Sequence, residues 1–504
     1  MRMIMIFKQF PFYIFLLPVF FVLHIVNEYY LLIPSNTVFS FIFYYLVVAA
    51  LLFLFGKLIY KSGLKAGIWG TALLTIFFFF GAMHDFFIKL LHSHVITSYK
   101  MVLPLLLITG IFFSVYLLKT KQQLSGISKF LNVLFCLFTI IELLQLGYKK
   151  VSNRKGKVDF GYVSRKDSDK IKCSEKNIKP DIFFIVFDEY ASSPSLEKNF
   201  SFKNSQLDSV FKSNNFYIAQ NSKSNYDLTP LSIASTFNLD YFHHPMPDTL
   251  SLKFWLQGWY TLKMSNLPTL LAAHGYKILN YGLCDFNEYP AHTHRYITKF
   301  EARLLYEETL WGRIKKDIFW NFTTHIPFFN RYSERELNNT KKGYIERNFN
   351  NLQSVLSQLK TQESEPKFVF GHIMMPHTPY YLDQHGNLVP ESIRIKGGGY
   401  DKKLYLDQLI YTNKLISQLI NASNQPFERP RIIIIEGDHG FRDKDPSVPN
   451  EYHFTNLNTY FFSDKDYTSL YDSISPVNTF RIVLNKYFNT NLPLLKDSTI
   501  FIKH

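Results

Sequence analysis

The sequence predicts an N-terminal helical membrane bundle of about five spans followed by an α/β domain with a mostly parallel central sheet. Residues 1 to about 148 are almost entirely apolar, whereas the rest of the 504-residue chain has a mixed composition. In that second part, short apolar runs alternate with helical patterns, which is typical of an open parallel sheet covered by helices. Several of these runs end in acids or histidines, which indicates a site at one edge of the sheet.

Five apolar runs approach the ~20 residues that a helix needs to cross a bilayer. They are 10–30, 37–56, 66–88, 101–118 and 127–147. No small-residue cleavage site follows the first run, so we do not expect a removable signal peptide. Lysine and arginine are concentrated before the first run and in alternate loops, which predicts a cytoplasmic N-terminus and an extracytoplasmic C-terminal part. The polar residues inside the runs, such as His24, His84 and Asp85, are expected at the membrane interface.

The formal charge of +15 does not indicate a nucleic-acid partner, because no basic helix or aromatic-interleaved basic stripe is present. Much of the excess lies in residues 149–180, directly after the last apolar run. This stretch is either a basic segment against anionic headgroups or a solvated linker. A disulfide between Cys173 and Cys284 is possible, but two cysteines outside the apolar region form no framework.

The soluble part, residues 181–504, contains three continuous apolar runs that predict buried strands, at 179–190, 367–375 and 431–440. Helix-type patterns lie between them. We predict helices over 267–278, 348–360 and 405–423, the last with an apolar stripe near helical period.

Polar residues stand near the carboxyl end of each of these runs: Asp188 in the first, His372 in the second, and Asp438 with His439 in the third. Singly, each is an ordinary turn or capping residue. Together they converge on one edge of the sheet, outside the carboxyl ends of the strands. Asp188, Asp438 and His439 offer two oxygen ligands and one imidazole, so we expect one divalent metal ion. Zn²⁺ or Mn²⁺ is favoured, with Mg²⁺ or Ca²⁺ as alternatives.

The predicted nucleophile is Thr229, which stands before a probable helix within residues 224–242. Coordination of its hydroxyl to the metal would lower the pKa of that hydroxyl, and the helix N-terminus would help to stabilise the anion. The alternative is a simple N-cap, with Pro230 at the first helical position. Ser232 and Ser235 are rivals that lie within the helix and are expected to be less exposed.

Three histidines complete the candidate set. His372 and His377 flank a proline-containing loop in "GHIMMPHTPYY", where they could donate hydrogen bonds to a substrate or act as general acids. His453 lies just before a final predicted strand and is a candidate on position alone, since a lone histidine is more often structural.

These motifs resemble the alkaline phosphatase superfamily, in particular its sulfatase-like branch of membrane phosphoethanolamine transferases and lipoteichoic acid synthases. The resemblance rests on strand–Asp, a threonine opening a helix, the His…His-Thr-Pro-Tyr loop and a strand ending in Asp-His-Gly. It implies five membrane helices that carry an extracytoplasmic sulfatase-like domain.

Residue by residue, the resemblance makes Thr229 the nucleophile and a metal contact. It makes Asp188, Asp438 and His439 metal ligands, and it gives His372, His377 and, less closely, His453 contacts with the substrate. The Cys-x-Pro-x-Arg signature of true sulfatases is absent, and Asn413 replaces an acid that is usual in the family helix.

The resemblance implies a metal-dependent phosphotransferase that takes a phospho-headgroup from a phospholipid donor and passes it to a surface glycan or lipid. A hydrolase of the same fold, phosphodiesterase or sulfatase-like, is the alternative, and a catalytically inactive membrane protein is less favoured. We expect a monomer at the periplasmic face of a bacterial inner membrane.

Overall fold

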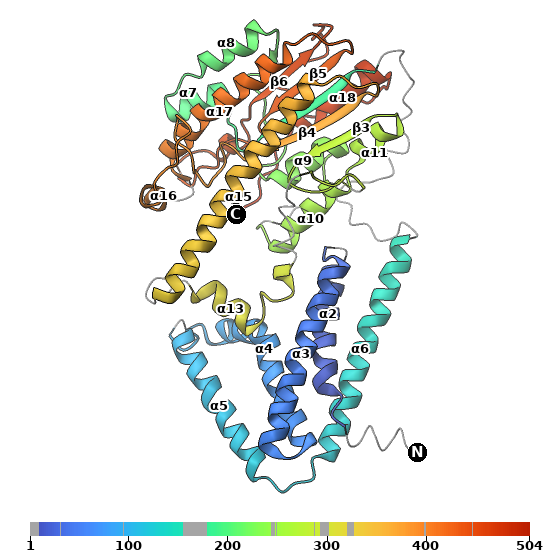
Figure 1. The fold of residues 1–504 in the computed structure, drawn as a ribbon, viewed down its shortest axis with the longest axis vertical. Coiled ribbons are helices and arrows are strands. Elements are labelled where there is room, and N and C mark those ends of the chain that lie inside the picture. Colours follow the sequence, from blue (N-terminus) through green and yellow to red (C-terminus); the bar gives the residue numbers. More distant parts are fainter. Residues whose placement is uncertain are drawn as a thin grey trace. The chain divides into compact units, whose positions relative to one another are not determined.

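The computed structural model describes residues 10–154 and 179–503, except for 31, 94, 243–246, 248, 287, 293–301, 320–326, 398–399 and 446. The described chain forms two compact units (Figure 1). The first comprises Met1–Val158 together with Thr298–Arg335, and the second comprises Asp159–Ile297 together with Glu336–His504. Most of the predicted basic linker, residues 155–178, lies outside the described residues, and so does Cys173 of the possible disulfide.

The first unit contains a helix over each predicted span: α2 (Tyr13–Glu28), α3 (Ser35–Tyr60), α4 (Gly63–Leu91), α5 (Tyr99–Lys119) and α6 (Ser125–Arg154). Helices α3 to α6 are long and apolar enough to cross a membrane, whereas α2 is apolar but has only 16 residues. The predicted helical bundle is confirmed, with four long helices and one shorter one. Small residues let α2 and α4 approach closely, because a Cβ on Gly70 would lie 2.5 Å from Ile14 Cδ1.

A segment distant in sequence joins this first unit. Helix α13 (Leu310–Asp317) carries Arg313, whose Nη2 lies 2.6 Å from Asp85 Oδ2 in α4 and 2.7 Å from Glu308 Oε2. The hydroxyl of Tyr45 in α3 donates to the carbonyl of Leu305 at 2.9 Å. Asp85, predicted at the membrane interface, therefore forms part of a contact with residues that follow it by more than 200 positions.

The second unit is built on a six-stranded sheet in the order β2-β6-β5-β1-β4-β3 (Figure 1). The strands are β1 (Asp181–Phe187), β2 (Tyr217–Ile218), β3 (Lys277–Tyr281), β4 (Lys367–Ile373), β5 (Arg431–Glu436) and β6 (Asn458–Phe462). Strands β3, β4, β1 and β5 pair in parallel, and β6 and β2 are antiparallel additions at one edge. The predicted α/β domain with a mostly parallel sheet is confirmed.

Helices cover both faces of the sheet. On one face, Phe184 of β1 packs against Phe237 of α9 (Thr229–Asn238) and Phe480 of α18 (Pro476–Phe488). On the other face, α15 (Pro327–Lys360) lies so close to β4 that a Cβ on Gly371 would meet Val355 at 2.6 Å. The other helices are α7 (Ser193–Phe200), α8 (Ser205–Ser213), α10 (Leu252–Lys263), α11 (Asn266–Ala273), α16 (Glu391–Gly397), α17 (Lys402–Ser423) and the 3₁₀ helix η3 (Asn450–His453).

The three predicted strands correspond to β1, β4 and β5, which are neighbours in the sheet. One predicted helix is wrong in part, because residues 267–278 contain all of α11 except its first residue and then the first two residues of β3. The break falls at Gly275, whose φ of 80° is the left-handed conformation that commonly ends a helix. Cys284 is a buried free thiol whose pKa is raised by burial.

Candidate active site

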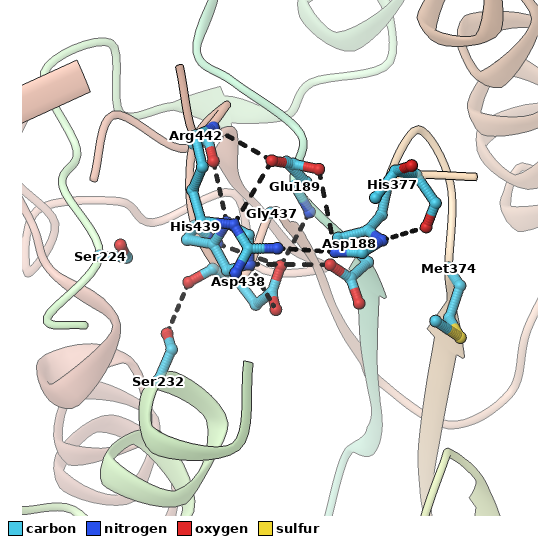
Figure 2. Close-up of polar contacts among 12 residues, drawn as sticks. Asp188, Glu189, Ser224, Ser232, Met374, His377, Gly437, Asp438, His439 and Arg442 are labelled. Carbon is cyan, nitrogen blue, oxygen red and sulfur yellow. Dashed lines mark hydrogen bonds and ion pairs between the residues drawn. The ribbon is translucent and has the colours of Figure 1, made fainter. Parts of the chain in front are cut away.

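The candidate site lies at the carboxyl ends of β1 and β5, the two central strands (Figure 2). Asp188 follows β1, and Asp438 and His439 follow β5 after a single glycine. One ligand atom from each of the three residues lies within 4.8 Å of the other two. The structure therefore brings Asp188 to the adjacent pair Asp438 and His439, which follow it by 250 and 251 positions in the sequence, as the convergence of parallel strands predicts.

These three side chains are buried, with exposed fractions of 2% for Asp188 and 0% for Asp438 and His439. One atom of each has no hydrogen-bond partner among the described residues: Asp188 Oδ1, Asp438 Oδ2 and His439 Nε2. Buried polar atoms are normally hydrogen-bonded, and leaving one unpaired costs ~1–3 kcal/mol. Three such atoms in one place indicate a ligand.

The remaining polar atoms of the site hold these unpaired atoms in position. Asp438 Oδ1 accepts from the backbone N–H of Glu189 at 3.0 Å and of His439 at 3.1 Å. His439 Nδ1 lies 2.8 Å from the carbonyl oxygen of Gly440. Because a carbonyl can only accept, Nδ1 carries the proton and Nε2 presents its lone pair to the carboxylates. This is the tautomer that a metal-binding histidine needs.

The distances fit a metal ion. His439 Nε2 lies 3.6 Å from Asp438 Oδ2 and 3.8 Å from Asp188 Oδ1. Tetrahedral ligands with metal bonds of ~2.1 Å would be ~3.4 Å apart, so small shifts bring the three atoms to coordination distance. Two carboxylate oxygens and one imidazole suit Zn²⁺ or Mn²⁺, and the geometry does not select among divalent ions.

Two glycines explain why the apolar strand β5 ends as "EGDHG". A Cβ on Gly437 would lie 2.3 Å from the carbonyl oxygen of Tyr190, and one on Gly440 would lie 2.3 Å from that of Tyr452. Neither distance is possible for a side chain, so only glycine lets the neighbouring backbone pass. Asp438 and His439 are consequently held between two close backbone contacts.

His372 lies behind Asp188. It is 1% exposed, and its Nε2 is 3.1 Å from Asp188 Oδ2. Burial alone would raise the pKa of the Asp188 carboxyl, but His377, His372 and His439 together hold that pKa well below its usual range. The predicted substrate contact of His372 stays a prediction. Its position is that of a residue that orients a metal ligand.

Thr229 is the first helical residue of α9, and Leu228 is its N-cap. The predicted alternative, in which Thr229 is the N-cap and Pro230 the first helical residue, is therefore wrong by one position. Its hydroxyl makes no hydrogen bond within the described chain, and the residue is half-buried. One turn further, Ser232 donates to the carbonyl oxygen of Asp438 at 2.6 Å, which ties α9 to the metal-binding loop. Ser232 and Ser235 are buried and donate to backbone carbonyls, so Thr229 is the most accessible of the three hydroxyls.

His377 is held by its neighbours. Its Nδ1 donates to the carbonyl of Thr378, so its Nε2 accepts the hydrogen bond from Arg442 Nη2 at 2.7 Å. Glu189 contacts both the segment of Arg442 and that of His377. Its Oε1 accepts from the Arg442 backbone N–H at 3.0 Å, and its Oε2 is 3.9 Å from His377 Nε2. Glu189 also adopts φ 62°, a left-handed conformation that costs a non-glycine residue about 1–2 kcal/mol.

His453 faces protein groups on both sides of its ring. Its Nε2 donates to the carbonyl of Asp443 at 3.1 Å, and its Nδ1 lies 3.7 Å from Asp227 Oδ2. It therefore connects the loop after β5 with the segment that leads into α9. The predicted substrate contact of His453 stays a prediction.

Sequence reasoning missed three participants. Glu189 and Arg442 each stand within three residues of a predicted ligand. Their charged side chains close to the Asp188 and Asp-His-Gly motifs are the feature of the sequence that could have identified them. Glu436, the last residue of β5, is fully buried, and neither carboxylate oxygen has a hydrogen-bond partner in the described chain. Burial, and then the nearby Asp438, raise the pKa of Glu436 well above its usual value.

Residues 180–469 match the family model named Sulfatase, and this match spans more than half of the chain. The chain belongs to the sulfatase family. This confirms the predicted sulfatase-like branch, and it makes the protein a sulfatase-like transferase or hydrolase. No curated protein matches the sequence.

Solved structures with similarity to this sulfatase-family chain include one membrane protein and two soluble domains. The lipooligosaccharide phosphoethanolamine transferase EptA of Neisseria meningitidis is 10% identical, with a TM-score of 0.36. The match covers 95% of this chain and 94% of the EptA chain. The C-terminal periplasmic domain of EptC from Escherichia coli, in complex with Zn, is 12% identical (TM-score 0.38, 63% and 85% covered). The periplasmic domain of phosphoethanolamine transferase EptC from Campylobacter jejuni is 14% identical (TM-score 0.36, 64% and 92% covered).

Proposed function

We propose that this protein is a metal-dependent phosphotransferase that moves a phospho-headgroup, phosphoethanolamine- or glycerophosphate-like, from a phospholipid to a surface glycan or lipid. The observation that carries the proposal is the set of three buried, unpaired ligand atoms of Asp188, Asp438 and His439 at one sheet edge. Helix α9, which begins at Thr229, is joined to that edge by Ser232. The apolar helices of the first unit would keep the enzyme in the membrane that holds its donor.

Asp188, Asp438 and His439 would hold one divalent ion, with Thr229 as a further contact, and Zn²⁺ or Mn²⁺ is favoured. When bound, the ion would supply positive charge that lowers the pKa of the Thr229 hydroxyl and offsets charge on phosphoryl oxygens. The orientation of its ligands comes from the chain itself, through Glu189 N–H and the Gly440 carbonyl.

The chemistry assigned to the chain has two displacements at phosphorus. Thr229 Oγ1 loses its proton and attacks the phosphodiester, the bond between phosphorus and the diacylglycerol oxygen breaks, and diacylglycerol leaves with a proton. An acceptor hydroxyl then attacks the phosphorus of the Thr229 phosphodiester, which still carries the headgroup; the bond to Thr229 Oγ1 breaks, and the proton lost by the acceptor returns to Thr229 Oγ1. Because α9 begins at Thr229, the backbone N–H dipoles at the start of this helix would help to stabilise the developing charge.

The proposed organisation is a membrane domain over residues 1–148, a basic linker over 149–180 and a catalytic domain over 181–504 on the extracytoplasmic face. Within the last range, Thr298–Arg335 belongs to the compact unit of the membrane helices. The lysine-rich alternate loops of the first unit support this orientation.

The test uses the full-length protein in detergent with fluorescent phosphatidylethanolamine and added Zn²⁺ or Mn²⁺. We expect release of diacylglycerol by the wild type, none by Thr229→Ala, and a phosphate-containing adduct on Thr229 by intact-mass and peptide analysis. Ser235→Ala, which removes a hydroxyl that is bonded only within α9 and keeps both Thr229 and the contact of Ser232 with Asp438, is the matched control for the helix. If Thr229→Ala turns over as fast as the wild type, Thr229 is not the nucleophile. If water is the only acceptor, the enzyme is a hydrolase and not a transferase.

A further inference from the structure

Arg442 is placed beside the metal-binding group but is not used by it. It follows the Asp-His-Gly motif by two residues, and its side chain is 16% exposed. Figure 2 shows it with Glu189, His377 and His439. Its guanidinium lies between the loop after β5 and His377, since Nη2 donates to His377 Nε2 at 2.7 Å. Arginine is favoured wherever a planar, charged donor must bind phosphate or sulfate oxygens.

The guanidinium is not engaged in an ordinary structural salt bridge. In such a pair, two N–H groups bind the two carboxylate oxygens in parallel. Here Glu189 Oε1 accepts from the backbone N–H of Arg442 at 3.0 Å, whereas Arg442 Nε is 3.5 Å away and has no hydrogen bond within the described chain. Nη1 likewise makes no hydrogen bond among the described residues. Glu189 thus fixes the backbone of Arg442 and leaves part of its donor fork available.

The charge of the site also requires a cation of this kind. Asp188, Asp438 and Glu189 bring three carboxylates into a buried region, and a divalent ion offsets only two of them. With Arg442 the group becomes neutral once the ion is bound. Without Arg442 it would keep a net negative charge and repel an anionic substrate, because buried charges are weakly screened.

The environment of His377 points the same way. Its Nε2 accepts from Arg442, so this nitrogen holds no proton that could be given to a leaving group. Instead, the imidazole accepts from the guanidinium, and the backbone N–H of His377 donates to the carbonyl of Asp188 at 3.1 Å, which fixes this loop beside Asp188. His377 is therefore placed to orient Arg442.

We propose that Arg442 is a substrate-positioning residue that binds the non-bridging oxygens of the phosphoryl or sulfuryl group undergoing transfer, with His377 and Glu189 as the residues that hold it in place. The proposal rests on the proposed function for the identity of the substrate, but the anion that it binds is the group common to phosphotransferases and sulfatase-like hydrolases. Arg442 thereby selects for a tetrahedral anion at the metal.

The experiment compares Arg442→Ala and Arg442→Lys with Lys444→Met in the full-length, metal-loaded protein. Lys444 is a matched control, because it is an exposed cation in the same loop whose Nζ lies over the ring of Tyr400. The readouts are kcat/KM with fluorescent phosphatidylethanolamine, the inhibition constant of inorganic phosphate, and bound metal.

We expect Arg442→Ala to lose about 100-fold in kcat/KM, in the range seen when one donor to a transition-state anion is removed. The inhibition constant of phosphate should rise at least about 10-fold, and the metal content should stay at the wild-type level. Arg442→Lys, which keeps the charge but not the fork, should fall between wild type and Arg442→Ala. Added guanidinium chloride should restore part of the activity of Arg442→Ala, and Lys444→Met should remain within about twofold of wild type.

Two results would overturn the proposal. The first is a phosphate inhibition constant and kcat/KM within threefold of wild type in Arg442→Ala. The second is loss of bound metal in Arg442→Ala and Arg442→Lys alike, which would make Arg442 a support of the metal site. If the wild type does not turn over phosphatidylethanolamine at all, the proposed function fails, but calorimetric binding of inorganic phosphate to the metal-loaded variants still tests Arg442.

Discussion

Buried acids occur in both units of the molecule, and they differ in whether their oxygens are paired. In the membrane helices, Glu142 of α6 is 6% exposed and both of its oxygens are used: Oε1 lies 2.8 Å from His24 Nδ1, and Oε2 accepts from Asn27 at 2.5 Å. In the sulfatase-like unit, Asp188 Oδ1 and Asp438 Oδ2 are equally buried and have no hydrogen bond within the described chain.

This difference separates two meanings of a buried charge. An ionisable residue inside a membrane span is by default a candidate for function, yet Glu142 is satisfied by its own neighbours and serves to join α2 to α6. The unpaired oxygens of Asp188 and Asp438 still need a positive partner. Burial alone therefore does not identify a site, whereas unpaired ligand atoms of several buried residues within reach of one another indicate one.

The largest expected effect is that of Asp438→Asn, which removes one ligand charge while preserving shape. Bound metal should fall from one ion per chain to near zero, and turnover should fall by about three orders of magnitude, as expected when several kcal/mol of charge stabilisation is lost. Elemental analysis and the diacylglycerol assay measure the two quantities. Glu142→Gln is the matched variant and should keep its metal. Full metal occupancy in Asp438→Asn would show that the unpaired oxygen of Asp438 does not bind the metal.

Removal of the metal should destabilise the sulfatase-like unit. An ion present at 100 times its Kd contributes ~2.7 kcal/mol to the folded state, and each kcal/mol corresponds to ~2–4 °C for a unit of this size. We expect a chelator to lower the temperature of the unfolding transition by about 5–10 °C and added Zn²⁺ or Mn²⁺ to restore it. Intrinsic fluorescence measures the transition. In Asp438→Asn the chelator should have no effect; an equal shift in that variant would place the metal elsewhere.

His372→Gln should weaken metal binding by about 10- to 100-fold, because His372 orients Asp188 from behind. A competition titration with a fluorescent chelator measures the affinity. If the metal affinity is unchanged and the KM for the phospholipid rises, then His372 contacts the substrate, as the sequence resemblance predicts, and the orienting role is wrong.

The smallest effect is expected for Arg313→Met in the membrane unit. Arg313 pairs with Asp85 and Glu308, but these partners are 46% and 52% exposed, so solvent screens the interaction. We expect a loss of about 1 kcal/mol or less, seen as a shift of at most a few degrees in the detergent-solubilised protein, with unchanged metal content. Loss of metal here would show that the two units are coupled.

The strands and the approach of Asp188, Asp438 and His439 to one another could be predicted from the sequence, because the apolar runs and the polar residues that end them are local signals. A continuous apolar run such as Ile432–Ile435 fits a central parallel strand, and the rule that such strands share a ligand edge then brings Asp188 near Asp438. The helix predicted over 267–278 is too long, because the left-handed conformation of Gly275 ends α11 before the apolar pattern ends.

Long-range pairs could not be predicted in this way. Glu189 meets Arg442 across 253 positions, and Arg313 meets Asp85 across 228. Nothing in the local pattern of either residue indicates its partner, since a charge in a loop is usually solvated. The ring of His453 also faces a residue distant in sequence, because its Nδ1 lies near the carboxylate of Asp227 while its Nε2 bonds the nearby carbonyl of Asp443.

The return of residues 302–317 to the membrane helices has a practical consequence. A soluble fragment that begins near residue 179 would retain Arg313 while lacking Asp85, and Leu305 would lose the phenol of Tyr45. Trp311, already 51% exposed, would then sit on a stretch with no surface to lie against. Purification of the catalytic half alone will go best if this excursion is excised and its ends are rejoined by a short polar bridge.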